Sequence, residues 1–203
     1  MQKIMIIALL ILMALSIMAC EEDGELRIRN RTSARVNFTV DEANPQQLES
    51  WTNWSRYYSD DRVVQVQYQG DYVFTNTLER SVYKGLVTTI DINANGGAIR
   101  LINNGNNAIN AVFLSPSSET EWGDDDLMGI LEVNGEAQWT LTPGQWDVRV
   151  IDSTNTSYYK LGVTVTVDQT LNLPLSTFTK SAVKAKMEGI SAEPKTHRSF
   201  RTF

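Results

Sequence analysis

Five acidic side chains within eight positions form one group of metal-ligand types in the chain. They are Glu119, Glu121, Asp124, Asp125 and Asp126. Carboxylate oxygens are the ligands that Ca²⁺ takes, so the group predicts a calcium site as one reading. The Asp-x-Asp-x-Asp-Gly spacing of an EF-hand is absent from the sequence. We favour the reading in which these aspartates accept hydrogen bonds from loop backbone NH groups while Trp122 plugs one end of a sandwich.

Aromatic side chains in polar stretches offer a second chemistry, the stacking of sugar rings. The candidates for ligand contact are Trp51, Trp54, Tyr57 and Trp122. Flat aromatic faces beside Asn and Asp hydrogen-bonding groups are typical of carbohydrate sites. Trp139 and Trp146 lie on the apolar phase of their strands and are assigned to the core. Packing of a loop is the competing reading for the aromatic residues of the polar stretches.

Catalytic arrangements find little support in the sequence. His197 is the only histidine and lies near the C-terminus, which removes the usual Ser-His-Asp and Cys-His arrangements and multi-His metal sites. Neither a Gly-rich phosphate loop nor a nucleotide fingerprint occurs. A carboxylate pair such as that of a glycosidase is available wherever acids are plentiful, so it is not specific. We expect a non-enzymatic protein with no cofactor apart from the calcium alternative.

The single cysteine, Cys20, falls where an apolar segment ends and a polar sequence begins. Lys3 precedes the apolar run 4–18, which is shorter than the roughly 20 residues that a membrane-spanning helix needs. Residues 1–19 are therefore predicted to be a signal peptide. Residues 17–20, Ile-Met-Ala-Cys, resemble the bacterial lipobox, which implies cleavage before Cys20 and lipidation of its sulfur. Two alternatives stay open: secretion of a protein with a free thiol, or an uncleaved anchor helix.

The lipobox resemblance implies a place in the bacterial cell envelope. Two or three acyl chains on Cys20 would hold the protein firmly, because a single chain binds a membrane only reversibly. Residues 20–23 then form a lipidated acidic tether. The tract 21–23, Glu-Glu-Asp, resembles the one that sends some lipoproteins to the outer face of the outer membrane. The outer membrane is the expected location, and its periplasmic and surface faces both stay open.

The rest of the chain is predicted to be all-β. Runs with period-two alternation, such as 64–68 and 146–150, are separated by Asn, Asp, Gly and Pro clusters. No cysteine remains in this part, so the fold must stand without disulfides. Asn134-Gly135 predicts a tight hairpin turn between residues 131–133 and 137–141.

Two halves of this body match each other in order. Residues 26–30 align with 99–103 at an offset of 73, Gly70-Asp71-Tyr72 aligns with Gly144-Gln145-Trp146 at 74, and Tyr83-Lys84 aligns with Tyr159-Lys160 at 76. We therefore predict two tandem small antiparallel β-sandwich modules, residues 24–95 and 96–175. The alternative, in which the two copies close one sandwich between them, stays open.

The second copy resembles a small β-sandwich module found in many secreted bacterial proteins. The elements that carry the resemblance are Asn103–Asn107, Ile109–Leu114, Ser115–Ser117, Trp122–Leu127, Gly135 and Gly144–Val148. The match covers residues 99–167 and extends only weakly to the first copy. The resemblance implies a β-sandwich fold, and because the module has no settled activity it implies no function.

Charge separates the body from the C-terminal tail. Residues 20–175 carry 11 Lys plus Arg against 22 Asp plus Glu, whereas residues 176–203 carry six basic and two acidic residues. An acidic body argues against nucleic acid as a partner. The tail 176–203 is predicted to be basic and largely disordered, either solvated or docked on an acidic surface or anionic lipid. Exposed edge strands leave the oligomeric state open.

Taken together, these features predict a non-enzymatic, lipid-anchored cell-envelope protein that serves as an interaction or structural module. A carbohydrate-binding surface lipoprotein that uses loop aromatics is the first alternative. A calcium-stabilised adhesion-type module is the second. The expected partners are the membrane, through the lipid anchor, and an envelope protein or a glycan.

Overall fold

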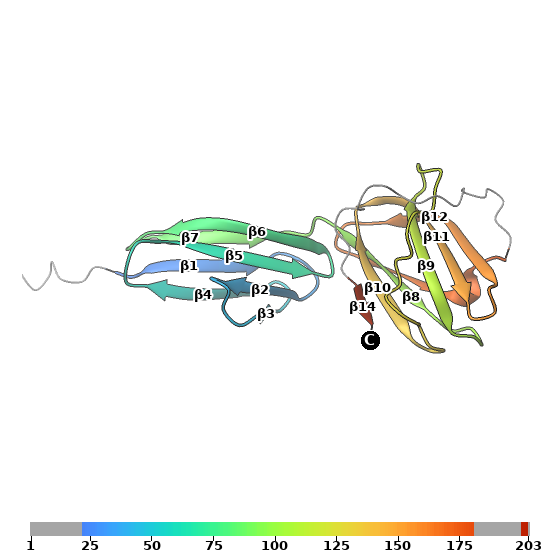
Figure 1. The fold of residues 1–203 in the computed structure, drawn as a ribbon. Coiled ribbons are helices and arrows are strands. Elements are labelled where there is room, and N and C mark those ends of the chain that lie inside the picture. The colour runs from blue at the N-terminus through green and yellow to red at the C-terminus, as the bar shows by residue number, and fades with distance from the viewer. Residues whose placement is uncertain (1–21, 181–199, 203) are drawn as a thin grey trace, which may run out of the picture.

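A computed structural model describes residues 22–180 and 200–202 of the chain. The prediction of an all-β fold is confirmed, and the strands form four sheets (Figure 1). The predicted signal peptide 1–19 and Cys20 lie outside the described residues. Within the described ranges, no helix is long and apolar enough to cross a membrane.

The first half of the body consists of two sheets, ordered β4-β1-β7 and β3-β2-β5-β6, that share one apolar core. Its strands are β1 (Gly24–Asn30), β2 (Val36–Val40), β3 (Gln46–Leu48), β4 (Asn53–Tyr58), β5 (Arg62–Gly70), β6 (Val73–Val82) and β7 (Val87–Ile92). β1 lies between antiparallel β4 and parallel β7. The alternation predicted for β5 is confirmed, since Val64 and Val66 are buried while Gln65 and Gln67 are exposed.

The second half has two further sheets, ordered β13-β8-β10-β14 and β12-β11-β9, with a core of its own. Its elements are β8 (Gly97–Ile102), β9 (Ile109–Pro116), β10 (Glu136–Leu141), β11 (Gly144–Asp152), β12 (Ser157–Val165), β13 (Thr170–Pro174), the 3₁₀ turn η1 (Leu175–Thr177) and β14 (Phe200–Thr202). β8 lies between antiparallel β10 and parallel β13. This is the pairing pattern of β1 in the first half.

The strand pairing corrects two of the three internal matches. Residues 26–30 and 99–103 both lie in the central strand of their sheet, β1 and β8. Gly70, however, ends β5 whereas Gly144 begins β11, so the match at 74 aligns opposite ends of two strands. The match at 76 also fails, because Tyr83 and Lys84 follow the end of β6 whereas Tyr159 and Lys160 lie inside β12. The connection between β9 and β10 is longer than that between β2 and β4, and the offset grows at that point.

The hairpin predicted at Asn134-Gly135 is wrong in its pairing. Asn134 has the positive φ of a turn residue, 64°. Leu131 nevertheless pairs with Ile109 of the other sheet, and β10 pairs with β8. The backbone of the turn is instead hydrogen-bonded to the backbone of Asn103. The Asn103 NH donates to the Gly135 carbonyl at 2.9 Å, and the Asn103 carbonyl accepts from Asn134 N at 2.7 Å. The turn therefore joins two sheets instead of two neighbouring strands.

Ordered structure continues past residue 176, where the disordered tail was predicted to begin. Phe178 is buried in the second core, and Thr179 exchanges two backbone hydrogen bonds with Tyr159, at 2.8 and 3.0 Å. Farther along the chain, β14 pairs antiparallel with β10. Apolar burial and backbone pairing thus order residues that composition alone assigns to the tail. Residues 181–199 lie outside the described ranges.

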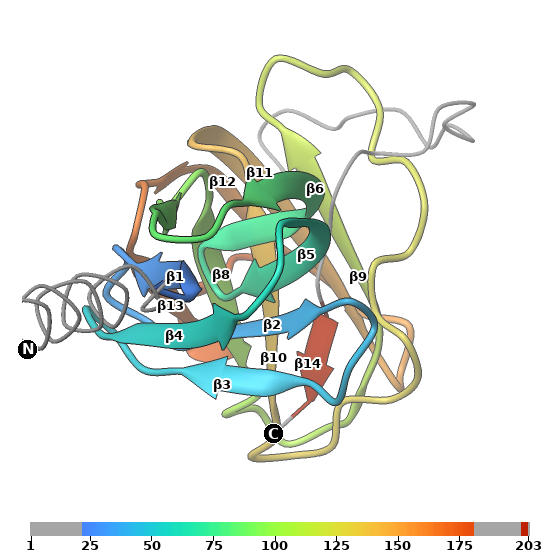
Figure 2. The ribbon, with the colours of Figure 1, turned by 90° about the vertical axis from the view of Figure 1, so that its left-hand side faces the viewer.

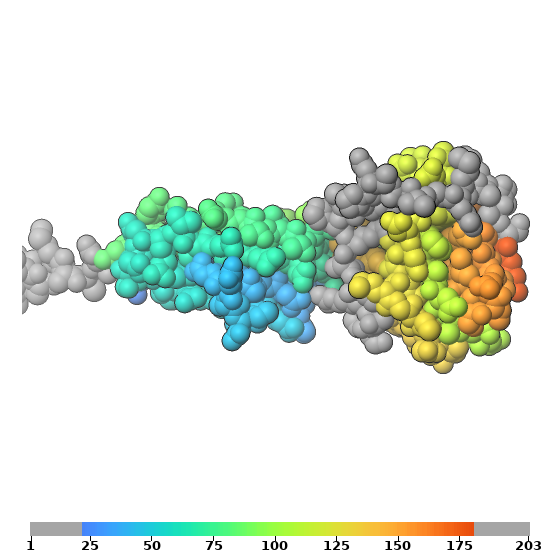
Figure 3. All heavy atoms as spheres, viewed as in Figure 1, coloured from blue at the N-terminus to red at the C-terminus, as the bar shows by residue number. Residues whose placement is uncertain are grey.

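The two halves lie end to end, joined by the short connection between β7 and β8 (Figures 1 and 2). Polar contacts between the halves lie near this connection. The Ser33 NH donates to Asp168 Oδ1 at 2.8 Å, and the Ser33 hydroxyl donates to the Asp168 carbonyl at 3.0 Å. The hydroxyls of Tyr72 and Thr170 are 2.8 Å apart. The space-filling view shows the elongated shape that results (Figure 3).

Asp152, the last residue of β11, is a buried carboxylate that organises the turn after it. Its Oδ1 accepts hydrogen bonds from Thr154 N at 2.9 Å, Thr154 Oγ1 at 2.6 Å and Thr156 N at 2.9 Å. Its Oδ2 accepts from the Asn107 amide at 3.1 Å. Burial raises the pKa of Asp152, but the hydrogen bonds outweigh burial and hold that pKa well below its usual range.

We expect Asp152→Asn to lower the free energy of unfolding at neutral pH and to reduce its dependence on pH. Because the pKa is lower in the folded than in the unfolded chain, ionised Asp152 stabilises the fold above about pH 4. That stabilisation is lost as pH falls toward the folded pKa. Urea denaturation at several pH values measures this, and parallel stability curves for the variant and the wild type would contradict it.

Candidate binding face

Three arginines alternate with buried residues along β1 and just past its end. Leu26 and Ile28 are fully buried, whereas the side chains of Arg27, Arg29 and Arg31 keep 37%, 34% and 41% of their surface exposed. Successive side chains of a strand point to opposite faces, so the arginines form a row on the outer face of sheet β4-β1-β7. We call Arg27, Arg29 and Arg31, together with Trp51 and Tyr57, the arginine face.

Two carboxylates accompany the three guanidinium groups. Asp91 of β7 accepts from Arg29 Nε and Nη2 at 2.6 and 2.7 Å, and from Arg31 Nε at 3.2 Å. Glu25 accepts from Arg27 Nε and Nη2, both at 2.9 Å. The bond from Arg29 lowers the pKa of Asp91, and that from Arg27 lowers the pKa of Glu25. Three cations against two carboxylates leave one net positive charge at neutral pH.

Arg31 holds most of the remaining capacity to bind an anion. Among the described residues its guanidinium makes one hydrogen bond, to Asp91. A guanidinium carries five N–H donors in a planar fork that matches carboxylate and phosphate groups. Most donors of Arg31 are therefore available to a ligand oxygen.

Trp51 stands at the end of the row. It lines a surface hollow of about 250 Å³ with the three arginines, Thr52 and Asn53. The residue is 62% exposed, and its backbone φ is 57°. A bulky residue adopts such a left-handed conformation rarely, at a cost of about 1–3 kcal/mol. A strained, exposed aromatic residue indicates a ligand contact more than a packing role.

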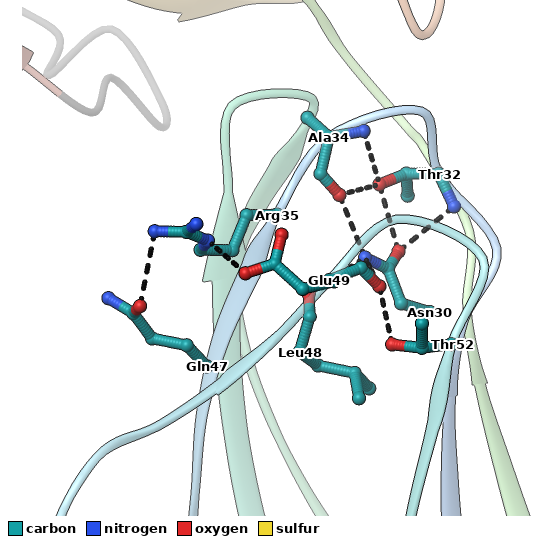
Figure 4. Close-up of polar contacts among 8 residues, drawn as sticks. All are labelled: Asn30, Thr32, Ala34, Arg35, Gln47, Leu48, Glu49 and Thr52. Atoms are coloured by element: carbon teal, nitrogen blue, oxygen red, sulfur yellow. Dashed lines mark hydrogen bonds and ion pairs between the residues drawn. The ribbon is translucent and has the colours of Figure 1, made fainter.

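Buried Asn30 fixes the loop that presents Trp51 (Figure 4). Its amide donates to the carbonyls of Leu48 and Glu49 at 3.1 and 3.0 Å. The Asn30 NH donates to the Thr52 carbonyl at 2.9 Å, and Thr52 Oγ1 donates to the Glu49 carbonyl at 2.7 Å. Both ends of the loop are therefore tied to the end of β1, next to the arginines.

The second half repeats this arrangement without the tryptophan. The Asn103 amide donates to the carbonyls of Leu131 and Glu132 at 3.1 and 3.0 Å, as Asn30 does in the first half. The left-handed position of the loop is occupied there by Asn134, with φ 64°. Asn adopts this conformation readily, whereas tryptophan does not. At this position the first half therefore has a residue that is unfavourable in the left-handed conformation, whereas the second half has a residue that favours it.

The four predicted ligand-contact aromatics divide into two pairs. Trp51 and Tyr57 are 62% and 63% exposed, and Tyr57 lies on the same face of β4 as the arginine row. Trp54 packs edge-on against Phe38, with ring centroids 5.2 Å apart, beside the first core. Trp122 is only 2% exposed. Trp54 and Trp122 therefore serve packing, which corrects their assignment as ligand contacts.

The acidic cluster does not gather into a metal site. Asp125 Oδ1 accepts from Val112 N and Leu127 N, both at 2.9 Å, and Asp126 Oδ2 accepts from Leu114 N at 2.7 Å. These carboxylates extend the pairing of the β9 edge. In the described part of the chain, no group of three His, Cys, Asp or Glu side chains is arranged to hold a metal ion. The calcium alternative for Glu119, Glu121, Asp124, Asp125 and Asp126 therefore finds no such group there, and the contacts of Asp125 and Asp126 agree with the favoured reading of loop hydrogen bonds.

Sequence reasoning missed the arginine row, although its signal was present. Arg27, Arg29 and Arg31 occur at every second position, which on a strand places them on one face. The matching stretch of the second half, residues 99–103, contains only Arg100. The arginine face is therefore specific to the first half.

Comparison with known proteins identifies no family. No family model matches the sequence, and the curated proteins give no match. A solved structure with a similar stretch is that of the Bacillus anthracis TIE protein, at 12% sequence identity and a TM-score of 0.28. The similar region covers 75% of this chain and 33% of that protein, so the chain spans about a third of its length.

Proposed function

We propose that this chain is a non-enzymatic binding protein of the bacterial cell envelope, anchored by lipid on Cys20. The lipobox-like residues 17–20 and the charged, apolar and acidic order of residues 3–23 support the anchor. The acidic tract favours the outer membrane. The lipid would act as the tether, and the β-structured body would meet the partner.

We further propose that the body consists of two tandem copies of one β-sandwich unit, residues 24–95 and 96–175. Three features support this division: two separate apolar cores, the shared pairing pattern around β1 and β8, and the matching contacts of Asn30 and Asn103. The ligand site then belongs to the first copy, which alone has the arginine face.

The ligand class that fits the arginine face best is a glycan that carries carboxylates. The single observation that carries this proposal is Trp51, exposed and strained beside three arginines. Its ring offers a flat surface to a sugar ring, and Arg31 offers a planar fork to a carboxylate. A neutral sugar would use the ring but leave the guanidinium donors unmatched.

The anchor is tested by intact mass and by protease shaving of the protein in its own cells. We expect a mass that corresponds to acylated Cys20 with residues 1–19 removed. Loss of the body on shaving would place the protein on the surface, whereas protection would place it inside the envelope. A mature chain that begins elsewhere with an unmodified thiol would contradict the anchor.

The ligand class is tested by tryptophan fluorescence with polygalacturonate and with dextran, an acidic and a neutral polysaccharide. We expect polygalacturonate to shift the emission in a saturable way and dextran to leave it nearly unchanged. The shift should weaken with salt, because exposed charges are screened over roughly 10 Å at 0.1 M ionic strength. Equal responses to the two polysaccharides would contradict the role of the arginines.

A further inference from the structure

Exposed apolar side chains gather at one end of the first half. Six of the large hydrophobic residues that are exposed lie in this half, and all except Trp51 lie near the end where β1 begins. They are Tyr57, Val63, Tyr83, Leu86 and Val87, which are 50–63% exposed. This end faces away from the second half (Figure 1).

The β6–β7 turn forms the apex of this end. The Leu86 NH donates to the Tyr83 carbonyl at 3.1 Å, and Gly85 supplies the left-handed position with φ 70°. The Lys84 NH donates to Asp61 Oδ1 at 2.8 Å, which fixes the turn against the β4–β5 connection. A turn held on both sides thus presents Tyr83 and Leu86, which are 50% and 58% exposed.

The chain segment that would carry the lipid runs directly against this turn. The Gly85 NH donates to the Glu22 carbonyl at 2.8 Å. A Cβ on Gly24 would lie 2.5 Å from the Tyr83 carbonyl oxygen, so the incoming strand fits closely against the residues of the turn. Cys20 precedes Glu22 by two residues, and two residues span at most about 7 Å. Acyl chains on Cys20 would therefore bring the turn to the membrane surface.

We propose that the β6–β7 turn, residues 83–87, docks on the lipid surface in which Cys20 is anchored. This inference rests on the proposed lipidation of Cys20. Tyr83 then lies at headgroup level, where amphipathic aromatic rings gather, and Leu86 enters the boundary of the acyl chains. Docking at this end points the second half away from the membrane and leaves the arginine face at the side, open to ligand.

The charges around the turn specify the kind of lipid. The two segments that contact the turn, through Glu22 and Asp61, carry Glu22, Asp23, Asp60 and Asp61, against Arg62 beside Asp60 and Lys84 in the turn itself. Four acidic and two basic residues repel an anionic surface more than a zwitterionic one. The turn should therefore dock more closely on phosphatidylcholine than on phosphatidylglycerol.

The test uses full-length lipidated protein that carries Leu86→Cys, labelled with a nitrobenzoxadiazole fluorophore. Cys20 is the only native cysteine, and lipidation would block its sulfur, so the new thiol takes the only label. The protein is placed in phosphatidylcholine vesicles with lipids brominated near the headgroup end of the acyl chains. We expect strong quenching, because an interfacial side chain lies about 5–10 Å into this boundary.

Met128→Cys is the matched control, since Met128 is 78% exposed and lies in the second half. Its label should show no quenching by the same lipids. Quenching that is absent at Leu86→Cys, or equal at the two positions, would overturn the docking. Stronger quenching in brominated phosphatidylglycerol vesicles than in phosphatidylcholine would overturn the charge argument.

The two proposals fail in different ways in this experiment. If Cys20 is not lipidated, its thiol takes a second label, which intact mass detects, and the anchor proposal fails. If intact mass finds an acylated protein with one label and Leu86→Cys is not quenched, the anchor stands and the docking proposal alone fails.

Discussion

Replacing Asn103 by alanine is expected to lower the free energy of unfolding of the second half by about 3–5 kcal/mol. The Asn103 amide donates to the carbonyls of Asn107, Leu131 and Glu132 at 3.0–3.1 Å, and its Oδ1 accepts from Gly105 N at 3.2 Å. The residue is fully buried. Each buried group left without a partner costs about 1–3 kcal/mol, and partial entry of water reduces the sum.

Chemical denaturation followed by tryptophan fluorescence measures this loss. Asn106→Ala is the matched control, because Asn106 is exposed in the same connection and a surface change of this kind usually stays within about 0.5 kcal/mol. Asn30→Ala should cost about as much in the first half, since Asn30 donates to the carbonyls of Ala34, Leu48 and Glu49. If Asn103→Ala and Asn106→Ala had equal effects, the buried network would not be the source of stability.

Alternation predicted the strands well where one face of a sheet is open to water. It failed for β10, in which Gln138 and Thr140 are 3% and 1% exposed although they occupy the polar phase. Thr140 lies at the contact between the halves, where its hydroxyl donates to the Asp71 carbonyl at 2.9 Å. Burial of this kind depends on how two units meet, which the period of a single strand does not encode.

The first internal match could be read from the sequence, whereas the later matches were misaligned. The match of residues 26–30 with 99–103 was informative because it ends on Asn30 and Asn103, whose buried contacts constrain the residue type. The later matches rested on Gly residues at strand ends and on Tyr residues in a turn and within a strand. Such residues recur for local reasons, so they do not report the added length of the β9–β10 connection.

Only part of the candidate site could be predicted from the sequence. Exposure of Trp51 follows from its polar surroundings, and the structure places it beside the arginines. Trp122 also lies in a polar stretch, yet its ring is buried near Tyr159 with centroids 6.0 Å apart. The fold decides whether a loop aromatic points inward, because loops lack the periodicity that assigns a residue to one face.

Replacing Trp51 by glycine is expected to separate binding from stability. The side chain is 62% exposed, so its removal loses little packing. Its φ of 57° suits glycine, and relief of the strain offsets the larger entropy of the unfolded chain. The free energy of unfolding should therefore stay unchanged or rise by up to about 1 kcal/mol.

Binding of polygalacturonate by the same variant should fall at least about tenfold, which corresponds to the loss of about 1.4 kcal/mol. Because tryptophan fluorescence changes in this variant, isothermal calorimetry is the measurement.

Trp51→Phe keeps an aromatic ring and should retain part of the affinity, and Arg31→Gln should reduce affinity and its dependence on salt. Arg80→Gln, on exposed β6 away from the arginine face, is the control and should bind normally. A loss of stability above about 2 kcal/mol in Trp51→Gly would instead make Trp51 a packing residue, because removal of an exposed ligand contact costs the fold nothing.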